Sequence, residues 1–208
     1  MQTDTLDSDT DVTIAPFYPR SGNAFTRALG RLILRVMGWT VEGELPPLRK
    51  ALLICAPHTS NWDLALCLGA MLSRGLRFSW MMKREAFFFP LGPVWRALGA
   101  VEVDRSRGSS LPKQMARWFD SVDAGYLGLM PEGTRHGVSE FKRGYLHIAR
   151  AADVPLFIVG IDARRKVMVL DRVWELTDDM RADNAAIRDY VRGRYEGMLP
   201  RVGTAAQS

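Results

Sequence analysis

Residues 51–72 read ALLICAPHTSNWDLALCLGAML, and this stretch decides the fold. The apolar run 51–56 ends at Pro57 and predicts a buried strand. Thr59, Ser60 and Asn61 are residue types that favour the beginning of a helix, so we expect a helix from Asp63 to Leu72 that stops near Gly75. The unit is therefore a strand, a short turn and a helix.

The same alternation continues along the chain. It predicts strands at 78–82, 101–103, 126–130, 156–161 and 166–170, and helices at 23–37, 94–98, 145–152 and 183–199, with another helix that Ser109 or Ser110 caps. Strands alternating with helices predict an α/β fold with a mixed, mostly parallel sheet flanked by helices. We expect a flexible tail at 1–22, an amphipathic helix at 23–38 and a single catalytic domain at 39–208.

Three candidate functional segments follow predicted strands: 57–63, 104–107 and 131–135. Sites in such sheets lie at the carboxyl ends of strands. We therefore expect the three segments to meet at one edge of the sheet.

The pair His58 and Asp63 is the candidate catalytic group. Inside one helix a spacing of five residues turns the two side chains about 140° apart. With His58 in the turn and Asp63 in the first helical turn they can meet, because helical side chains lean toward the amino terminus. Asp63 would then fix the tautomer of His58 and leave its other nitrogen free to accept a proton. A general base of this kind suits activation of a substrate hydroxyl group.

A simpler interpretation of the same pair is available. A His followed by Asp at this spacing also arises by chance, Asp63 can merely favour the helix amino terminus, and His58 can be an ordinary turn residue.

Composition narrows the class of protein. The 208 residues carry a formal charge of +5, which fits phosphate-bearing substrates, an anionic membrane surface or an ordinary solvated surface. The basic residues are scattered rather than striped, so no nucleic acid is expected as a partner. Cys55 and Cys67 lie in apolar runs and are expected to be buried free thiols. Residues 1–11 contain four Asp and no basic residue, and no apolar stretch approaches the ~20 residues of a spanning helix. We therefore expect a cytoplasmic protein with at most peripheral contact with the membrane.

The motif HTSNWD at 58–63 resembles the H-x(4)-D motif of the glycerolipid acyltransferase family, in particular its bacterial H-T-S-N-W-D branch. Three further blocks follow in the family's order: GAVEVDR at 99–105, PEGTR at 131–135 and VPLFIVG at 154–160. The resemblance covers about half of the chain and implies a fold like that of glycerol-3-phosphate acyltransferase. It also implies an enzyme that moves a fatty acyl group from acyl-CoA or acyl carrier protein to a lysophospholipid such as 1-acylglycerol-3-phosphate, on the inner face of the cell membrane. The family uses no metal and no bound cofactor.

The resemblance assigns His58 as general base and Asp63 as its partner. It assigns acceptor binding to Lys83, Arg105, Glu132, Gly133, Thr134, Arg135 and Lys142. Arginines suit a phosphate because the guanidinium group makes paired, charge-assisted hydrogen bonds. For Lys83 and Lys142 a solvated surface charge is an equally good interpretation.

The sequence departs from the family's pattern at two places, and these leave the identity of the acceptor undecided. Glu102 places a carboxylate near the second block, where it is expected to repel a phosphate, and the fourth block has Phe157 and Ile158 where many relatives carry a second proline. A non-phosphate lysolipid therefore remains an alternative acceptor. A thioesterase or lipid hydrolase that uses His58 on water is a second alternative, and a non-catalytic lipid-binding module is a third.

Two segments favour contact with a membrane. In the helix at 23–38, arginines recur at every fourth position opposite bulky apolar residues, and residues 86–95 read AFFFPLGPVW. Packing of both segments on the core of the domain is the alternative.

Overall fold

The computed structural model describes residues 22–60, 62–104, 111–133 and 140–198. Seven strands within these residues form one sheet in the order β1-β7-β6-β2-β5-β3-β4. Their bounds are β1 Thr40–Gly43, β2 Lys50–Ala56, β3 Phe78–Lys83, β4 Ala100–Val103, β5 Gly125–Leu129, β6 Leu156–Asp162 and β7 Val167–Trp174.

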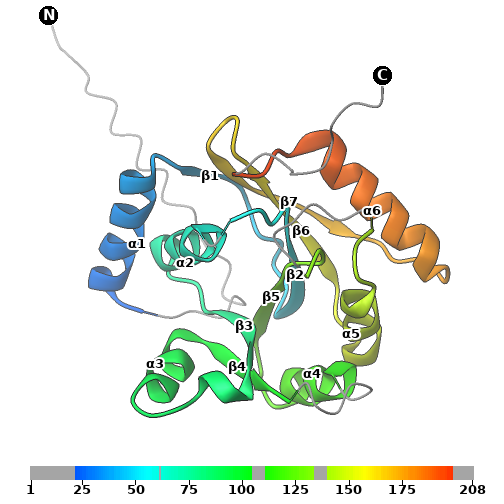
Figure 1. Ribbon diagram of the computed structural model, residues 1–208, viewed down its shortest axis with the longest axis horizontal. Coiled ribbons are helices and arrows are strands. Elements are labelled where there is room, and N and C mark those ends of the chain that lie inside the picture. Colours follow the sequence, from blue (N-terminus) through cyan, green and yellow to red (C-terminus); the bar gives the residue numbers. More distant parts are fainter. Residues whose placement is uncertain (1–21, 61, 105–110, 134–139, 199–208) are drawn as a thin grey trace, which may run out of the picture.

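Helices cover both faces of this sheet (Figure 1). Their bounds are α1 Ala24–Met37, α2 Trp62–Arg74, α3 Leu91–Leu98, α4 Leu111–Asp120, α5 Gly144–Ala152 and α6 Met180–Arg194, with a short 3₁₀ helix η1 at Arg84–Ala86. One apolar core, between α1–α3 and the sheet, contains Leu53, Leu66 and Trp80. The second core, under α4–α6, contains Leu52, Phe119 and Ile187. Neighbouring residues of β2 thus point into opposite cores, which explains why its sequence is apolar from Ala51 to Ala56.

Strand direction brings the predicted site segments together. Strands β6, β2, β5, β3 and β4 run parallel to one another, whereas β7 is antiparallel to β6 and β1 is parallel to β7. The carboxyl ends of β2, β5, β3 and β4 therefore lie along one edge, which we call the catalytic edge. The expected α/β fold with a mixed, mostly parallel sheet is confirmed.

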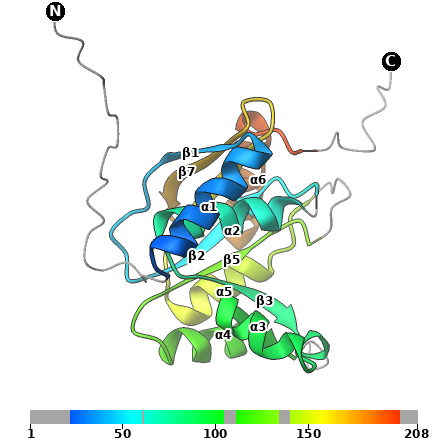
Figure 2. The same ribbon diagram turned by 90° about the vertical axis from the view of Figure 1, so that its left-hand side faces the viewer.

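Helix α1 has three faces rather than the two that its sequence suggested. Its arginines are exposed, and a narrow stripe that includes Gly30 and Leu34 is buried against α2. The remaining bulky apolar residues are exposed: Phe25, Leu29, Leu32 and Val36. At 100° per residue these four lie within about 60° of one another, so they form a separate apolar stripe directed away from the core. Figure 2 shows α1 facing the viewer across α2.

The sequence patterns missed strand β1 and misplaced both ends of helix α6. Strand β1 has four residues, TVEG, which show little apolar alternation and depend on pairing with β7. Helix α6 was expected at 183–199, but it begins after Asp179, whose side chain accepts hydrogen bonds from the N–H groups of Arg181 and Ala182. It ends at Arg194 because the chain becomes extended at Tyr195. The predicted caps Ser109 and Ser110, the tail at 1–21 and Asn61 lie outside the described residues.

Within the described part of the chain, no helix combines the length and apolar character needed to cross a membrane.

The close crossing of α1 and α2 predicts a large penalty at Gly30. A Cβ atom there would lie 2.3 Å from the backbone nitrogen of Ser73 and 2.8 Å from the carbonyl oxygen of Gly69. Gly30→Ala should therefore lower the free energy of unfolding by about 1–3 kcal/mol, as measured by urea denaturation, although alanine is the better helix former.

Gly193→Ala is the matched control, because a Cβ atom at Gly193 of α6 meets no atom within 4 Å. It should leave stability unchanged or raise it by up to about 1 kcal/mol. Equal effects of the two substitutions would contradict the packing described here.

Candidate active site

The turn between β2 and α2 is organised around the carboxylate of Asp63. This side chain is fully buried, and its Oδ2 atom lies 2.7 Å from Nδ1 of His58. The backbone N–H groups of Thr59 and Ser60 donate to the same oxygen at 2.9 Å each. The ring of His58 therefore has a fixed orientation beside a carboxylate that the turn itself holds in place.

This geometry selects a tautomer of His58. A carboxylate accepts hydrogen bonds, so Nδ1 carries the proton that points to Asp63 and Nε2 is the basic nitrogen. The side chain of His58 is 17% exposed. The arrangement can take a proton from a hydroxyl group and stabilise the imidazolium that results.

Glu132 supports the turn from the neighbouring strand. It follows β5, is buried, and its Oε2 atom accepts a 2.7 Å hydrogen bond from the backbone N–H of His58. The resemblance assigned Glu132 to the acceptor site. The contact seen here ties the loop after β5 to the loop after β2, so Glu132 also positions His58.

Gly133 and Lys142 lie beside this contact. Gly133 has φ +64°, and a Cβ atom at this position would come within 3.0 Å of the Cδ, Cε and Nζ atoms of Lys142. The backbone N–H of Lys142 donates to the carbonyl oxygen of Pro131. The side chain of Lys142 therefore packs against Gly133, next to Glu132. This contact places the ammonium group of Lys142 near the catalytic edge.

Lys83 is more distant from His58. It is the exposed last residue of β3, and the order β2-β5-β3 separates it from β2 by two strand spacings, on the order of 10 Å. Asp104, at the end of the second block, is held by Gln114 of α4, which exchanges two hydrogen bonds with its backbone. Arg105, Thr134 and Arg135 lie outside the described residues.

Glu102, which was expected to repel a phosphate, has two arginine partners. Its carboxylate forms ion pairs with Arg84 at 3.3 Å and with Arg96 at 3.1 Å, all three side chains being at least one-third exposed. Two guanidinium groups thus offset its charge, so Glu102 does not act as an unpaired carboxylate against a phosphate.

The two cysteines are buried free thiols, as expected. Cys67 lies on α2 one helical turn after Asp63. A hydrogen bond with Cys55, burial, and the negative charge of Asp63 raise the pKa of the Cys67 thiol. It therefore stays protonated at neutral pH and is not the nucleophile of this site. Among the described residues, no group of three or more His, Cys, Asp and Glu side chains could hold a metal ion.

Residues 195–198 reach the site from the far end of the described chain, a feature that the sequence patterns did not reveal. We call this segment the 195–198 crossing. The ring of Tyr195 covers Gly160 of β6, the carbonyl oxygen of Glu196 accepts from Ala163, and Gly197 touches Thr59. Met198 then packs against the core under α1–α3. The crossing thus passes over the carboxyl ends of β6 and β2 and supports the catalytic turn.

The crossing is anchored by Asp171 of β7. The hydroxyl groups of Tyr195 and Tyr190 donate to its Oδ2 atom at 2.7 and 2.8 Å. Burial by itself raises the pKa of Asp171, but the hydrogen bonds from Tyr195, Tyr190 and Arg172 outweigh it and hold the pKa below its usual value.

The fold and the site together define an α/β protein with a carboxylate-supported imidazole at the carboxyl edge of a mostly parallel sheet. Residues 39–162, more than half of the sequence, match the model of the Acyltransferase family, and the chain belongs to this family.

A solved structure shows the same fold. It is the 1-acyl-sn-glycerophosphate (LPA) acyltransferase PlsC from Thermotoga maritima, which is similar with a TM-score of 0.60 and 18% sequence identity. The match covers 81% of this chain and 76% of that one. No curated protein matches the sequence.

The contact between Gly197 and Thr59 predicts a coupled pair. A Cβ atom at Gly197 would lie 2.4 Å from Cγ2 and 2.6 Å from Oγ1 of Thr59, so Gly197→Ala must displace the crossing or the turn. Acyl transfer should fall about tenfold or more, because displacements of about 1 Å at a catalytic group cost up to about a hundredfold.

The double variant supplies the control. Thr59→Ala removes the two nearest atoms that the new methyl group meets and leaves only Cβ, at 3.1 Å, so Gly197→Ala should have a much smaller further effect in that background. Equal losses in both backgrounds, measured as kcat in a double-mutant cycle, would show that the contact does not position the turn.

Proposed function

We propose that this protein is an O-acyltransferase that moves a fatty acyl group from acyl-CoA or acyl carrier protein to the hydroxyl group of a lysophospholipid, such as 1-acylglycerol-3-phosphate. The observation that carries the proposal is the 2.7 Å contact between His58 and Asp63 at the catalytic edge of an Acyltransferase-family domain. The likeness to the Thermotoga maritima LPA acyltransferase supports this acceptor class.

The proposed reaction is a direct transfer. Nε2 of His58 takes the proton of the acceptor hydroxyl while the hydroxyl oxygen bonds to the thioester carbonyl carbon. Asp63 stabilises the imidazolium through Nδ1. The C–S bond then breaks, and the imidazolium returns the proton to the departing thiolate, so the products are an ester and a free thiol. No enzyme nucleophile is required, which agrees with the buried, protonated state of Cys67.

The acceptor phosphate would bind along the loops after β4 and β5. Arg105, Arg135 and Thr134 belong to these loops by sequence, and Lys142 lies against Gly133 at the same edge. The positive groups would pair with the phosphate, and the ion pairs of Glu102 with Arg84 and Arg96 lower the repulsion that a free carboxylate would add.

The proposal places the protein at the inner face of the cell membrane through two exposed apolar clusters. The first is the exposed apolar stripe of α1, which consists of Phe25, Leu29, Leu32 and Val36. The second, which we call the α3 patch, consists of Phe88, Phe89, Leu91, Val94 and Leu98. Helices α1 and α3 lie on the same side of the sheet (Figures 1 and 2). The exposed arginines of α1 suit anionic headgroups, and Phe89, 88% exposed, suits insertion among acyl chains.

Replacement of the general base tests the chemistry. His58→Ala should lower the rate of acyl transfer by about 10²–10⁴-fold, because it removes the proton acceptor. It should leave the circular dichroism spectrum unchanged, because the backbone N–H groups of Thr59 and Ser60 still donate to Asp63. His147→Ala is the matched control, since His147 is an exposed residue of α5. The assay offers purified protein a panel of lysolipids with labelled acyl-CoA and acyl carrier protein. Full activity in His58→Ala would refute the assigned role, and release of free acid without an acceptor would identify a hydrolase instead.

Point variants of the apolar clusters test the membrane contact without removing α1, whose Gly30 side is packed on α2. Phe25→Ser, Val36→Ser and Phe89→Ser should each weaken binding to anionic phospholipid vesicles by about tenfold, because each removes a large apolar contact with the lipid. Val173→Ser is the control, because Val173 is exposed on β7 outside both clusters. Vesicle flotation measures the binding, and unchanged binding in all three variants would refute the assignment.

A further inference from the structure

A cavity opens at the edge of the sheet opposite to the catalytic edge. Arg77 precedes β3, Gly99–Val101 begin β4, and Val122–Gly125 lead into β5, so the cavity lies where these three strands begin. Its volume is about 340 Å³, which is within the range of small-molecule sites. His58 and Glu132 lie beyond the other ends of β2 and β5, and Lys83 is the last residue of β3. The cavity is therefore separate from the acyl-transfer site.

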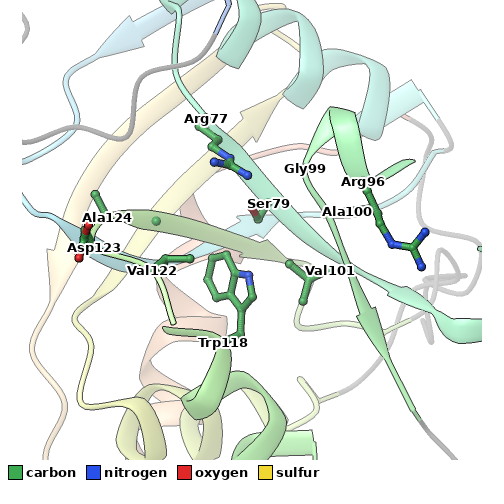
Figure 3. A pocket seen from close by; sticks show the side chains of 11 residues that line it. Arg77, Ser79, Arg96, Gly99, Ala100, Val101, Trp118, Val122, Asp123 and Ala124 are labelled. Carbon is green, nitrogen blue, oxygen red and sulfur yellow. The ribbon is translucent and has the colours of Figure 1, made fainter. Parts of the chain in front are cut away.

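Two side chains with unused hydrogen-bond donors line this cavity. Ser79 of β3 is 94% buried (6% exposed), yet its hydroxyl group has no hydrogen-bond partner among the described residues. Arg77 forms no ion pair with any described residue, and Figure 3 shows its guanidinium group directed toward Ser79 and Trp118. The hydroxyl group of Ser79 and the exposed guanidinium group of Arg77 are therefore both available to donate to one acceptor bound between them.

The other arginine of the cavity is already engaged. Arg96 pairs with Glu102 and its guanidinium lies 5.0 Å from the centre of the Phe87 ring. In Figure 3 it extends away from Ser79. The anion would therefore bind to Arg77 and Ser79 rather than between two arginines.

The remaining walls define the rest of the ligand. The indole of Trp118, from α4, lies between Val122 and Val101 and offers a flat apolar surface (Figure 3). At the far side, the carboxylate of Asp123 lines the cavity and can accept a hydrogen bond from a hydroxyl or amino group. A carboxylate there would repel a purely anionic ligand, so the occupant has a donor group at the end away from its anion.

We propose that this cavity is a second binding site, which takes a small organic anion. The anion, a carboxylate or a phosphate, pairs with Arg77 and Ser79, a flat apolar body covers Trp118, and a hydroxyl or amino group donates to Asp123. The proposal rests on these side chains alone and does not depend on the acyl-transfer reaction.

Nuclear magnetic resonance of the tryptophan indoles tests the site in the full-length protein. The chain has six tryptophans, and Trp118→Phe assigns the Trp118 signal by its loss. The probes are 4-hydroxybenzoate, which carries both an anion and a hydroxyl donor on a flat ring, and inorganic phosphate. The Trp118 signal should move saturably with 4-hydroxybenzoate and less, at equal concentration, with phosphate.

Three variants decide the contacts. Arg77→Gln should weaken 4-hydroxybenzoate binding about tenfold or more, and Ser79→Ala should weaken it severalfold, because each removes a hydrogen bond to a charged group. Arg117→Gln is the matched control, since Arg117 is an exposed arginine of α4 that does not line the cavity. Its binding should equal that of the parent protein.

Three results would overturn the proposal. One is a Trp118 signal that does not move with 4-hydroxybenzoate at concentrations up to about 10 mM, which is well above the Kd of most specific sites. Another is an equal loss of binding in Arg117→Gln and Arg77→Gln, which would reduce the effect to general attraction by positive charge. The last is binding of phosphate but not of 4-hydroxybenzoate, which would remove Trp118 and Asp123 from the site.

Discussion

The buried carboxylate of Asp63 is the constraint on which the site depends. A carboxylate removed from water costs several kcal/mol unless hydrogen bonds compensate it. Three donors compensate its Oδ2 atom, and all three belong to the turn that it follows: the ring of His58 and the backbone N–H groups of Thr59 and Ser60. The buried Oδ1 atom has no hydrogen-bond partner among the described residues. In this conformation three groups of the turn converge on one oxygen of Asp63, so the electrostatic requirement of that side chain helps to fix the orientation of the imidazole. Glu132 applies the same principle from the next strand by accepting the N–H of His58.

Parallel strands make the site a meeting of distant segments. The loops after β2 and β5 are far apart in sequence, yet the two strands are hydrogen-bonded neighbours and end at the same edge. On the opposite edge the loops that open β3, β4 and β5 form the cavity with Arg77 and Ser79. One sheet therefore carries two polar regions, separated by the length of its strands, with an apolar interior between them.

Much of this architecture could be predicted from local pattern. The apolar run of β2, the helix-capping residues and the five-residue spacing of His58 and Asp63 each carry a period or a geometry that sequence displays directly. Strand β1 was missed because its four residues gain their structure from β7, more than a hundred positions later. The sequence of α1 does not show which of its apolar residues are buried. The stripe with Phe25 and Val36 is exposed and the stripe with Leu34 is buried, because α2 packs against only one of them. The role of Glu132 toward His58 was hidden for a similar reason, because a backbone N–H leaves no trace in a sequence motif.

The 195–198 crossing affects when, during synthesis, the protein can become active. A ribosome releases residues in order, and the turn at 58–63 emerges long before Gly197 does. Until α6 has folded and Tyr195 has settled over Gly160, the turn lacks one of the surfaces that hold Thr59 in place. A nascent chain would thus carry its imidazole and carboxylate early but gain the contact of Gly197 with Thr59 only after residues 195–198 have emerged, which delays chemistry until α6 has folded.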